Sequence, residues 1–122
     1  METIKKHSDN VLSAPDAIIT ENFLFCSAQI PLDHNNGRLS GNDIESQTLQ
    51  VMLNLREVLE LKQLNFVDLV KTTIFVTDIA EISKIKRTYE SFFKLQQPVC
   101  SVIEVNRLPM AAKIAIEAIA KL

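Results

Sequence analysis

Only two stretches of this sequence repeat their apolar residues at the spacing of an α-helix, and short β-prone runs surround them. The first helix is expected to begin at Asn42, with Glu45 as its capping partner. The second follows Asp78 and Glu81, which repeat that arrangement. The two apolar stripes are Ile44, Thr48, Val51, Met52, Leu55, Val58 and Leu59, and then Ile82, Ile85, Tyr89 and Phe92. Each stripe is suited to covering one side of a sheet.

The β-prone runs predict the strands of that sheet. They span residues 17–20, 23–30, 69–77, 97–109 and 112–120, with a further short strand expected at 2–6. Glu21 and Asn22 separate the first two runs, which predicts a hairpin, and a polar loop follows at 33–42. The order β-β-α-β-α-β-β predicts an α+β fold with two helices on one face of a mixed, mostly antiparallel sheet.

Several of these runs carry apolar side chains on both faces, although two helices can cover only one. In the run 23–30, Leu24, Cys26 and Ala28 oppose Phe23 and Phe25. An uncovered apolar face of this size is unusual for a monomer. We therefore expect a homo-oligomer in which copies of the sheet pack together, with small-molecule sites in the clefts between subunits.

Composition narrows the function classes. A length of 122 residues predicts one domain, residues 1–122, and a net charge of −2 argues against a nucleic-acid partner. The apolar runs are too short to cross a membrane and the start lacks a signal-peptide core, so a cytoplasmic protein with two free thiols is expected. His7 and His34 have no neighbouring ligands, which predicts no metal site, and His34 is expected in a solvated loop. Two glycines cannot build a phosphate loop, so no cofactor is predicted.

Five segments, in order from about residue 14 to the end, resemble successive motifs of the RidA/YjgF family, also named endoribonuclease L-PSP. They are "SAQIPLD" (27–33), "VKTTIFVTD" (70–78), "YESFF" (89–93), "SVIEVNRLP" (101–109) and "IEAIA" (116–120). The resemblance implies a chorismate-mutase-like fold and a homotrimer with its sheets facing inward and three clefts between subunits. It also implies hydrolysis of 2-imino acids, such as 2-iminobutanoate and 2-iminopropanoate, to 2-keto acids and ammonia.

The same resemblance assigns site residues, several of which depart from the family pattern. Active members bind the substrate carboxylate with an arginine directly before a serine, and here that position is Cys100, before Ser101. The positions of a pocket tyrosine, asparagine, cysteine and water-positioning glutamate are occupied by Ala14, Lys86, Val102 and Ala115, and Ser27 retains its match. The scaffold motifs are therefore kept, whereas most of the pocket chemistry is changed.

Cys100 has three interpretations. The first is an inert buried hydrophobe, and the second is a nucleophilic or redox-sensitive thiol. In the third, Cys100 is part of a pocket for a less acidic or more apolar ligand, and Val102 and Ala115 favour this third interpretation. Lys86 is either a solvated helix residue or a single positive charge that replaces the arginine. The Ser27 hydroxyl either lines the pocket or bonds to the backbone.

Three functions follow. The first is 2-imino acid deaminase, and the absence of the carboxylate-binding arginine at position 100 argues against it. The second is a non-catalytic trimer that binds small metabolites. The third is an endoribonuclease or translation inhibitor, which the absence of a basic patch and of a suitable histidine pair disfavours.

Overall fold

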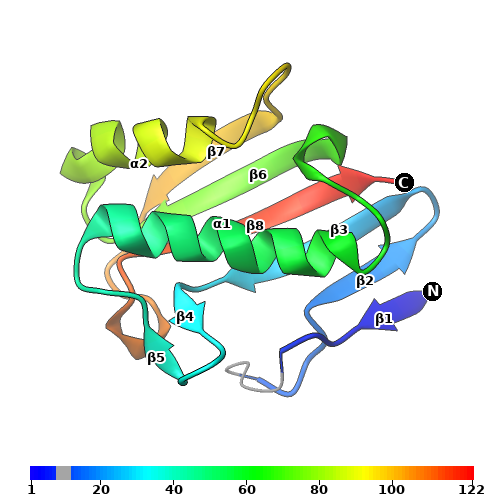
Figure 1. The fold of residues 1–122 in the computed structure, drawn as a ribbon, viewed down its shortest axis with the longest axis horizontal. Coiled ribbons are helices and arrows are strands. Elements are labelled where there is room, and N and C mark those ends of the chain that lie inside the picture. Colours follow the sequence, from blue (N-terminus) through cyan, green and yellow to red (C-terminus); the bar gives the residue numbers. More distant parts are fainter. Residues whose placement is uncertain (8–11) are drawn as a thin grey trace.

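The computed structural model of the chain describes residues 1–7 and 12–122, which form a six-stranded sheet with two helices on one face (Figure 1). In the order β1-β2-β3-β8-β6-β7, the strands are Glu2–Ile4, Ala17–Thr20, Phe23–Gln29, Ile114–Lys121, Leu69–Val76 and Val99–Glu104. The β6–β7 pair is parallel and the other pairs are antiparallel, which confirms the predicted α+β class. A small hairpin, β4 (Leu32–Asp33) with β5 (Arg38–Leu39), occupies part of the predicted polar loop.

The two helices lie where they were predicted, but their capping residues differ. They are α1 (Ile44–Glu60) and α2 (Ile82–Glu90), accompanied by short 3₁₀ turns at Phe66–Asp68, Ile79–Glu81 and Pro109–Ala111. Asp43, not Asn42, caps α1, because its carboxylate accepts a hydrogen bond from the Ser46 N–H at 2.9 Å. Asp78 accepts from the Ala80 N–H at 3.0 Å, and it therefore caps the turn before α2 rather than α2 itself.

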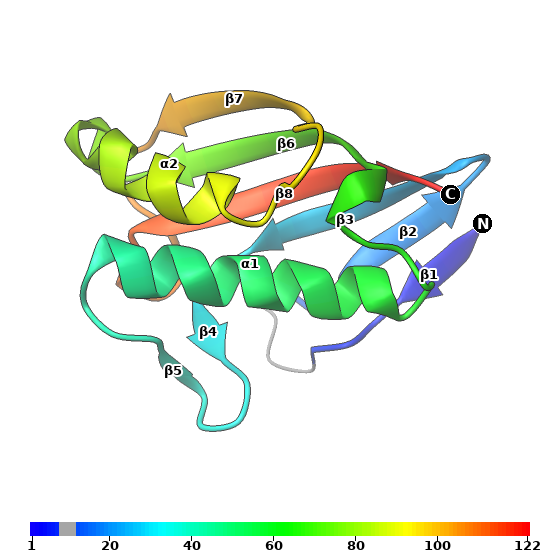
Figure 2. The same cartoon turned by 45° about the horizontal axis from the view of Figure 1, so that its top comes forward.

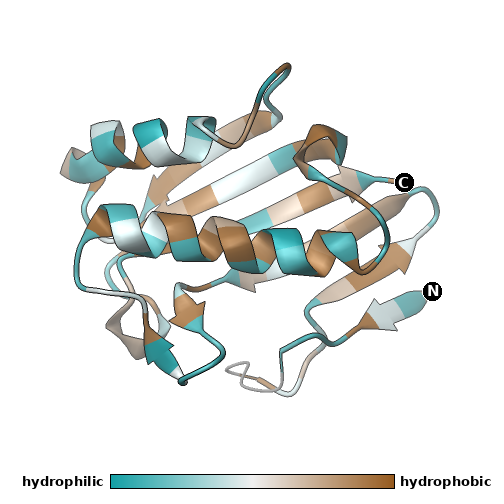
Figure 3. Ribbon diagram, in the orientation of Figure 1, coloured by the Kyte–Doolittle hydropathy of each residue, from teal (hydrophilic) through white to brown (hydrophobic). Residues whose placement is uncertain are grey.

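The core lies between these helices and the sheet. Val51, Met52, Leu55, Val58 and Leu59 of α1 are completely buried. Figures 2 and 3 show α1 and α2 side by side over the same face of the sheet, with hydrophobic residues continuing along the strands beneath them. No helix in the described part of the chain combines the length and the apolar character that crossing a membrane requires.

Buried Asn54 fixes α1 to the segment between β3 and β4. Its amide nitrogen donates to the Ile30 carbonyl at 3.1 Å and to the Leu32 carbonyl at 2.9 Å, and its oxygen accepts from Gln50 at 2.8 Å. A buried amide with these bonds satisfied holds the backbone in one arrangement. Ile30 and Leu32 therefore keep a fixed position next to the open face of the sheet.

The face of the sheet turned away from the helices carries large apolar side chains among polar ones, and it is not covered by another element within residues 1–7 and 12–122. Phe25 is 43 % exposed and Ile103 is 45 % exposed. Strand register places Phe75 beside both Ala115 and Ile103 on this face. The prediction that apolar side chains lie on both faces of several strands is confirmed, although Lys71 and Glu117 share the open face with them.

Candidate functional site

A pocket of about 440 Å³ opens beside the uncovered face and contains three of the predicted site residues, Ala14, Ser27 and Ala115. It is lined by these three and by Leu12, Pro15, Ala28, Gln29, Ile30, Leu32, His34, Phe75, Leu108, Pro109 and Glu117. Residues from β3, β6 and β8 thus meet the loop before β2, the segment after β3 and the turn after β7. Its volume is within the usual range for sites that bind small molecules.

The local backbone of β3 presents Ser27 to this pocket. The register between β3 and β8 shifts between Cys26 and Gln29, and the Ser27 N–H donates to the Asp16 carbonyl at 2.8 Å. The Gln29 amide donates to the Ser27 hydroxyl oxygen at 3.3 Å. Because that oxygen accepts from Gln29, the hydroxyl hydrogen is directed elsewhere and can be donated to a ligand.

Most of the lining residues were not among the predicted site residues, and His34 and Phe75 are two of them. His34 lines the pocket and stacks on His7, with ring centroids 3.6 Å apart and planes 5° from parallel. His34 does lie in a loop, as expected, but it is only partly exposed, because it stacks on a partner 27 positions away that no local pattern indicated. Phe75 alternates with core residues of β6, and only the strand register shows that it faces the pocket.

The other predicted site residues lie elsewhere in the chain. Cys100 and Val102 are on β7, at the edge of the sheet, and Lys86 is on α2. Cys100 is the register partner of Thr72, whose hydroxyl is 2.6 Å from the Tyr89 hydroxyl. Burial raises the pKa of Tyr89 above its ordinary value, and the Cys100 thiol also interacts with this phenol. These residues therefore belong to the helix side of the sheet.

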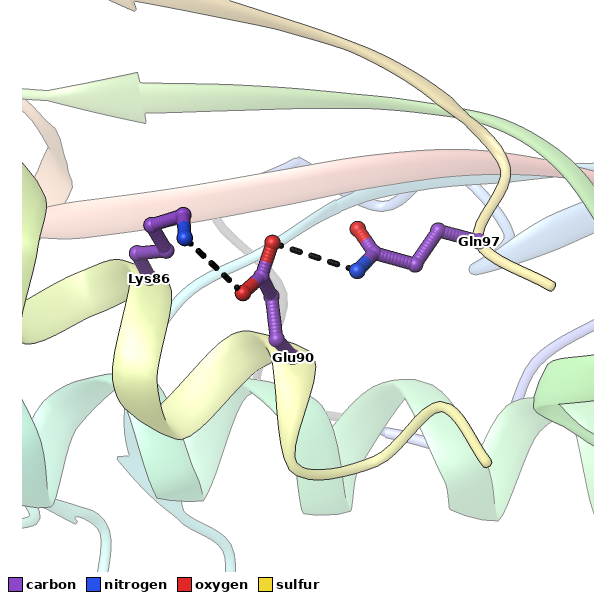
Figure 4. Close-up of polar contacts among 3 residues, drawn as sticks. All are labelled: Lys86, Glu90 and Gln97. Atoms are coloured by element: carbon purple, nitrogen blue, oxygen red, sulfur yellow. Dashed lines mark hydrogen bonds and ion pairs between the residues drawn. The ribbon is translucent and has the colours of Figure 1, made fainter. Parts of the chain in front are cut away.

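Lys86 takes part in a small polar network at the same edge (Figure 4). Its ammonium is 3.3 Å from one oxygen of Glu90, one helical turn away, and Gln97 donates to the other oxygen at 3.1 Å. The hydrogen bond from Gln97, together with Lys86, holds the pKa of the Glu90 carboxyl below its ordinary value. The Lys86 side chain is 68 % exposed, so a second anion can approach it from solvent.

Cys100 is exposed in a single chain, and its interpretation as a buried hydrophobe, which concerns a cleft between copies, stays a prediction. It lies on an edge strand whose six residues are all exposed, and no neighbouring strand covers its outer side within the described residues. Sequence reasoning placed Cys100 on the correct strand but could not give its position at the edge of the sheet.

The two cysteines are expected to differ sharply in reactivity. Burial raises the pKa of Cys26 to about 12 from an ordinary value of 9.0, so near pH 8 it holds about a thousandfold less thiolate than an ordinary thiol. We expect a disulfide reagent such as DTNB to modify one thiol per native chain rapidly and the second only after unfolding. In Cys100→Ser the rapid phase should vanish, and a rapid phase that survives would contradict this assignment.

The structure thus places the predicted residues in two groups. Ala14, Ser27 and Ala115 line the pocket by the open face, and the group formed by Lys86, Cys100 and Val102 lies at the β7 edge on the helix side. Within residues 1–7 and 12–122, no three His, Cys, Asp or Glu side chains gather as metal ligands would. A single site that contains both groups requires the β7 edge of one copy to meet the pocket of another.

Comparison with known proteins assigns the scaffold. Residues 9–122 match the family model described as Endoribonuclease L-PSP. A RutC family protein of Pyrococcus horikoshii is 38% identical over 104 residues, which are 85% of this chain and 82% of that protein. The 2-iminobutanoate/2-iminopropanoate deaminase of Salmonella typhimurium is 40% identical over 97 residues, 77% of this chain and 75% of that enzyme.

Solved structures agree with this assignment. The YjgF gene product of E. coli superposes with a TM-score of 0.92 at 32% identity and covers 99% of this chain and 98% of its own. E. coli TdcF with bound serine gives a TM-score of 0.93 at 26% identity, with complete coverage of both chains. The family model and these relatives match nearly the whole chain in sequence and in fold, and the chain therefore belongs to the RidA/YjgF family, also described as the endoribonuclease L-PSP family.

Proposed function

We propose that this protein is a cytoplasmic homotrimer that binds small 2-imino and 2-keto acids between its copies and hydrolyses the imines slowly. The observation that carries the proposal is the pocket beside the open face, which gathers Ala14, Ser27 and Ala115 from three separate segments. Relatives of 38–40% identity bear the name 2-iminobutanoate/2-iminopropanoate deaminase. The apolar open face supplies the surface on which copies would pack.

The trimer completes the site by adding the β7 edge of a neighbouring copy to the pocket. Cys100, Val102 and Lys86 would then lie across the cleft from Ser27 and Ala115. The exposed Lys86–Glu90 pair is of the kind that contributes little to stability, so Lys86 can turn to a substrate carboxylate at small cost. An ammonium offers a point charge rather than the two parallel donors of a guanidinium, and it therefore orients the acid less firmly.

The chemistry itself needs few groups. Water adds to the carbon of the C=N bond, the carbon becomes tetrahedral, and ammonia leaves as the carbonyl forms. Ser27 is placed to donate its hydroxyl hydrogen to the substrate or to the water, since Gln29 occupies its oxygen. Ala115 carries no group that could position the water, and Cys100 carries no charge for the acid when it is a thiol. The rate should consequently be far below that of an enzyme with those groups.

A non-catalytic role is the second candidate. It is favoured by one observation, namely that the described residues lining the pocket include no lysine and no arginine. Under this alternative the trimer binds a small metabolite without turning it over. A ribonuclease role has less support, because a net charge of −2 provides no attraction for phosphates.

The decay of 2-iminobutanoate, generated by a threonine dehydratase, separates the first two functions. We expect the imine to disappear faster with the protein than without it, and Lys86→Ala should remove most of that increase. If the protein binds 2-oxobutanoate but does not change the decay rate of the imine, the deaminase function is excluded and the non-catalytic binding role is supported. A Lys86→Ala rate equal to that of the natural protein would exclude Lys86 as the acid-binding residue.

A further inference from the structure

The pocket beside the open face has an apolar interior. Most of its lining side chains are aliphatic or aromatic, including Ile30, Leu32, Phe75 and Leu108. Leu32 is almost completely buried, and Asn54 fixes the backbone on both sides of it through the Ile30 and Leu32 carbonyls. The wall formed by Ile30 and Leu32 is therefore preformed, and a ligand would not have to order it first.

The size of the interior depends on small side chains. Ala115 is a register partner of Phe75 on β6, and Ala14 and Ala28 contribute methyl groups from two other segments. With these small residues, the pocket of a single chain, without the β7 edge of a neighbour, keeps about 440 Å³, far more than a one- or two-carbon substituent fills. Unfilled apolar volume gains nothing on binding, whereas a side chain that fills it removes apolar surface from water.

The charge on the lining disfavours an acid group deep in the pocket. Glu117 is the acidic residue among the described lining residues, none of them is lysine or arginine, and the histidine among them, His34, stacks on His7. A carboxylate placed among these side chains would lose its hydration without gaining a cationic partner. The polar end of a ligand is therefore expected at the rim, near Ser27, and its apolar end inside.

We propose that this pocket recognises a branched aliphatic or aromatic side chain. Among the 2-imino and 2-keto acids of the proposed function, on which this inference rests, those with such side chains are then preferred to the four- and three-carbon acids. Each additional methylene buried should strengthen binding about fourfold. An acid with an isobutyl or phenylethyl group should therefore bind at least about tenfold more tightly than 2-oxobutanoate.

Calorimetric titration tests this preference without requiring turnover. The probes are 2-oxobutanoate, 4-methyl-2-oxopentanoate, 4-phenyl-2-oxobutanoate and the neutral amide 3-phenylpropanamide. The variants Ala115→Leu and Ala28→Leu fill the pocket from different strands, and Ala28 is exposed, so its substitution should not disturb folding. Ala80→Leu, on an exposed turn outside the pocket, is the matched control.

The larger acids should bind most tightly, and either filling variant should weaken them at least tenfold more than it weakens 2-oxobutanoate. Ala80→Leu should bind every probe as the natural protein does. Binding of 2-oxobutanoate as tight as that of the larger acids would overturn the inference but not the proposed function. If no acid binds while the amide does, and Ala28→Leu weakens the amide, the proposed function fails and the apolar preference stands. Failure of the larger acids and of the amide together overturns the preference.

Discussion

Replacing Cys100 with arginine is expected to raise the rate of 2-iminobutanoate hydrolysis by about 30-fold to several thousandfold. Losing one partner of a desolvated, hydrogen-bonded charge pair costs about 2–5 kcal/mol. If that interaction stabilises the transition state, each 1.4 kcal/mol corresponds to about a tenfold change in rate. Cys100 is exposed on an edge strand, so the longer side chain can be accommodated without disturbing the core.

The same assay distinguishes charge from shape. Cys100→Leu adds bulk without charge and should leave the rate of the natural protein unchanged, and Cys100→Lys should give an intermediate increase because an ammonium binds a carboxylate through a point charge. Equal rates for Cys100→Arg and Cys100→Leu would contradict the view that this position lacks only a carboxylate anchor. A natural protein already as fast as Cys100→Arg would contradict it as well.

A glutamate in place of Phe25 is expected to convert the proposed trimer into monomers. Phe25 is 43 % exposed on the open face, and burying such a side chain between copies contributes about 1.5–3 kcal/mol per copy. That corresponds to roughly ten- to a hundredfold in affinity per copy, and an unpaired buried carboxylate adds a further penalty. Sedimentation should show three times the chain mass of 13.7 kDa for the natural protein and that single mass for Phe25→Glu.

Leu95→Glu is the control for Phe25→Glu. Leu95 is 90 % exposed in the loop before β7 and not on the sheet, so the same new charge there should leave the proposed trimer intact. Imine hydrolysis and binding of 2-oxobutanoate should both be lost with Phe25→Glu, because a single chain cannot bring the two halves of the proposed site together. Full activity in a monomeric Phe25→Glu protein would contradict an intersubunit site.

The sequence pattern predicted the core of this fold well because the fold depends on local periodicity. The stripe from Val51 to Leu59 and the β-prone run at 69–77 each became one element. The error at the start of α1 occurred because two neighbouring residues can both cap a helix. Asn42 and Asp43 are both good capping residues, and the backbone selects Asp43 because its carboxylate meets the Ser46 N–H.

The candidate site was predictable only in part. Ala14, Ser27 and Ala115 came from the family resemblance, and the structure brings all three to one pocket. His34 could not be predicted, since its place depends on stacking with His7 across the fold. The position of Cys100 on the sheet edge depends on the parallel pairing of β6 with β7, which no local pattern specifies.

Cross-linking measures most directly whether the pocket and the β7 edge meet between copies. In one chain, Ser27 and Cys100 lie on strands three positions apart in the sheet, a separation of about 14 Å. A bismaleimide with a shorter reach, added to Ser27→Cys, should therefore yield covalent dimers and trimers through the native Cys100. These products should be absent from Ser27→Cys combined with Cys100→Ser. Monomeric bands alone, or the same oligomers in both variants, would contradict a site shared between copies.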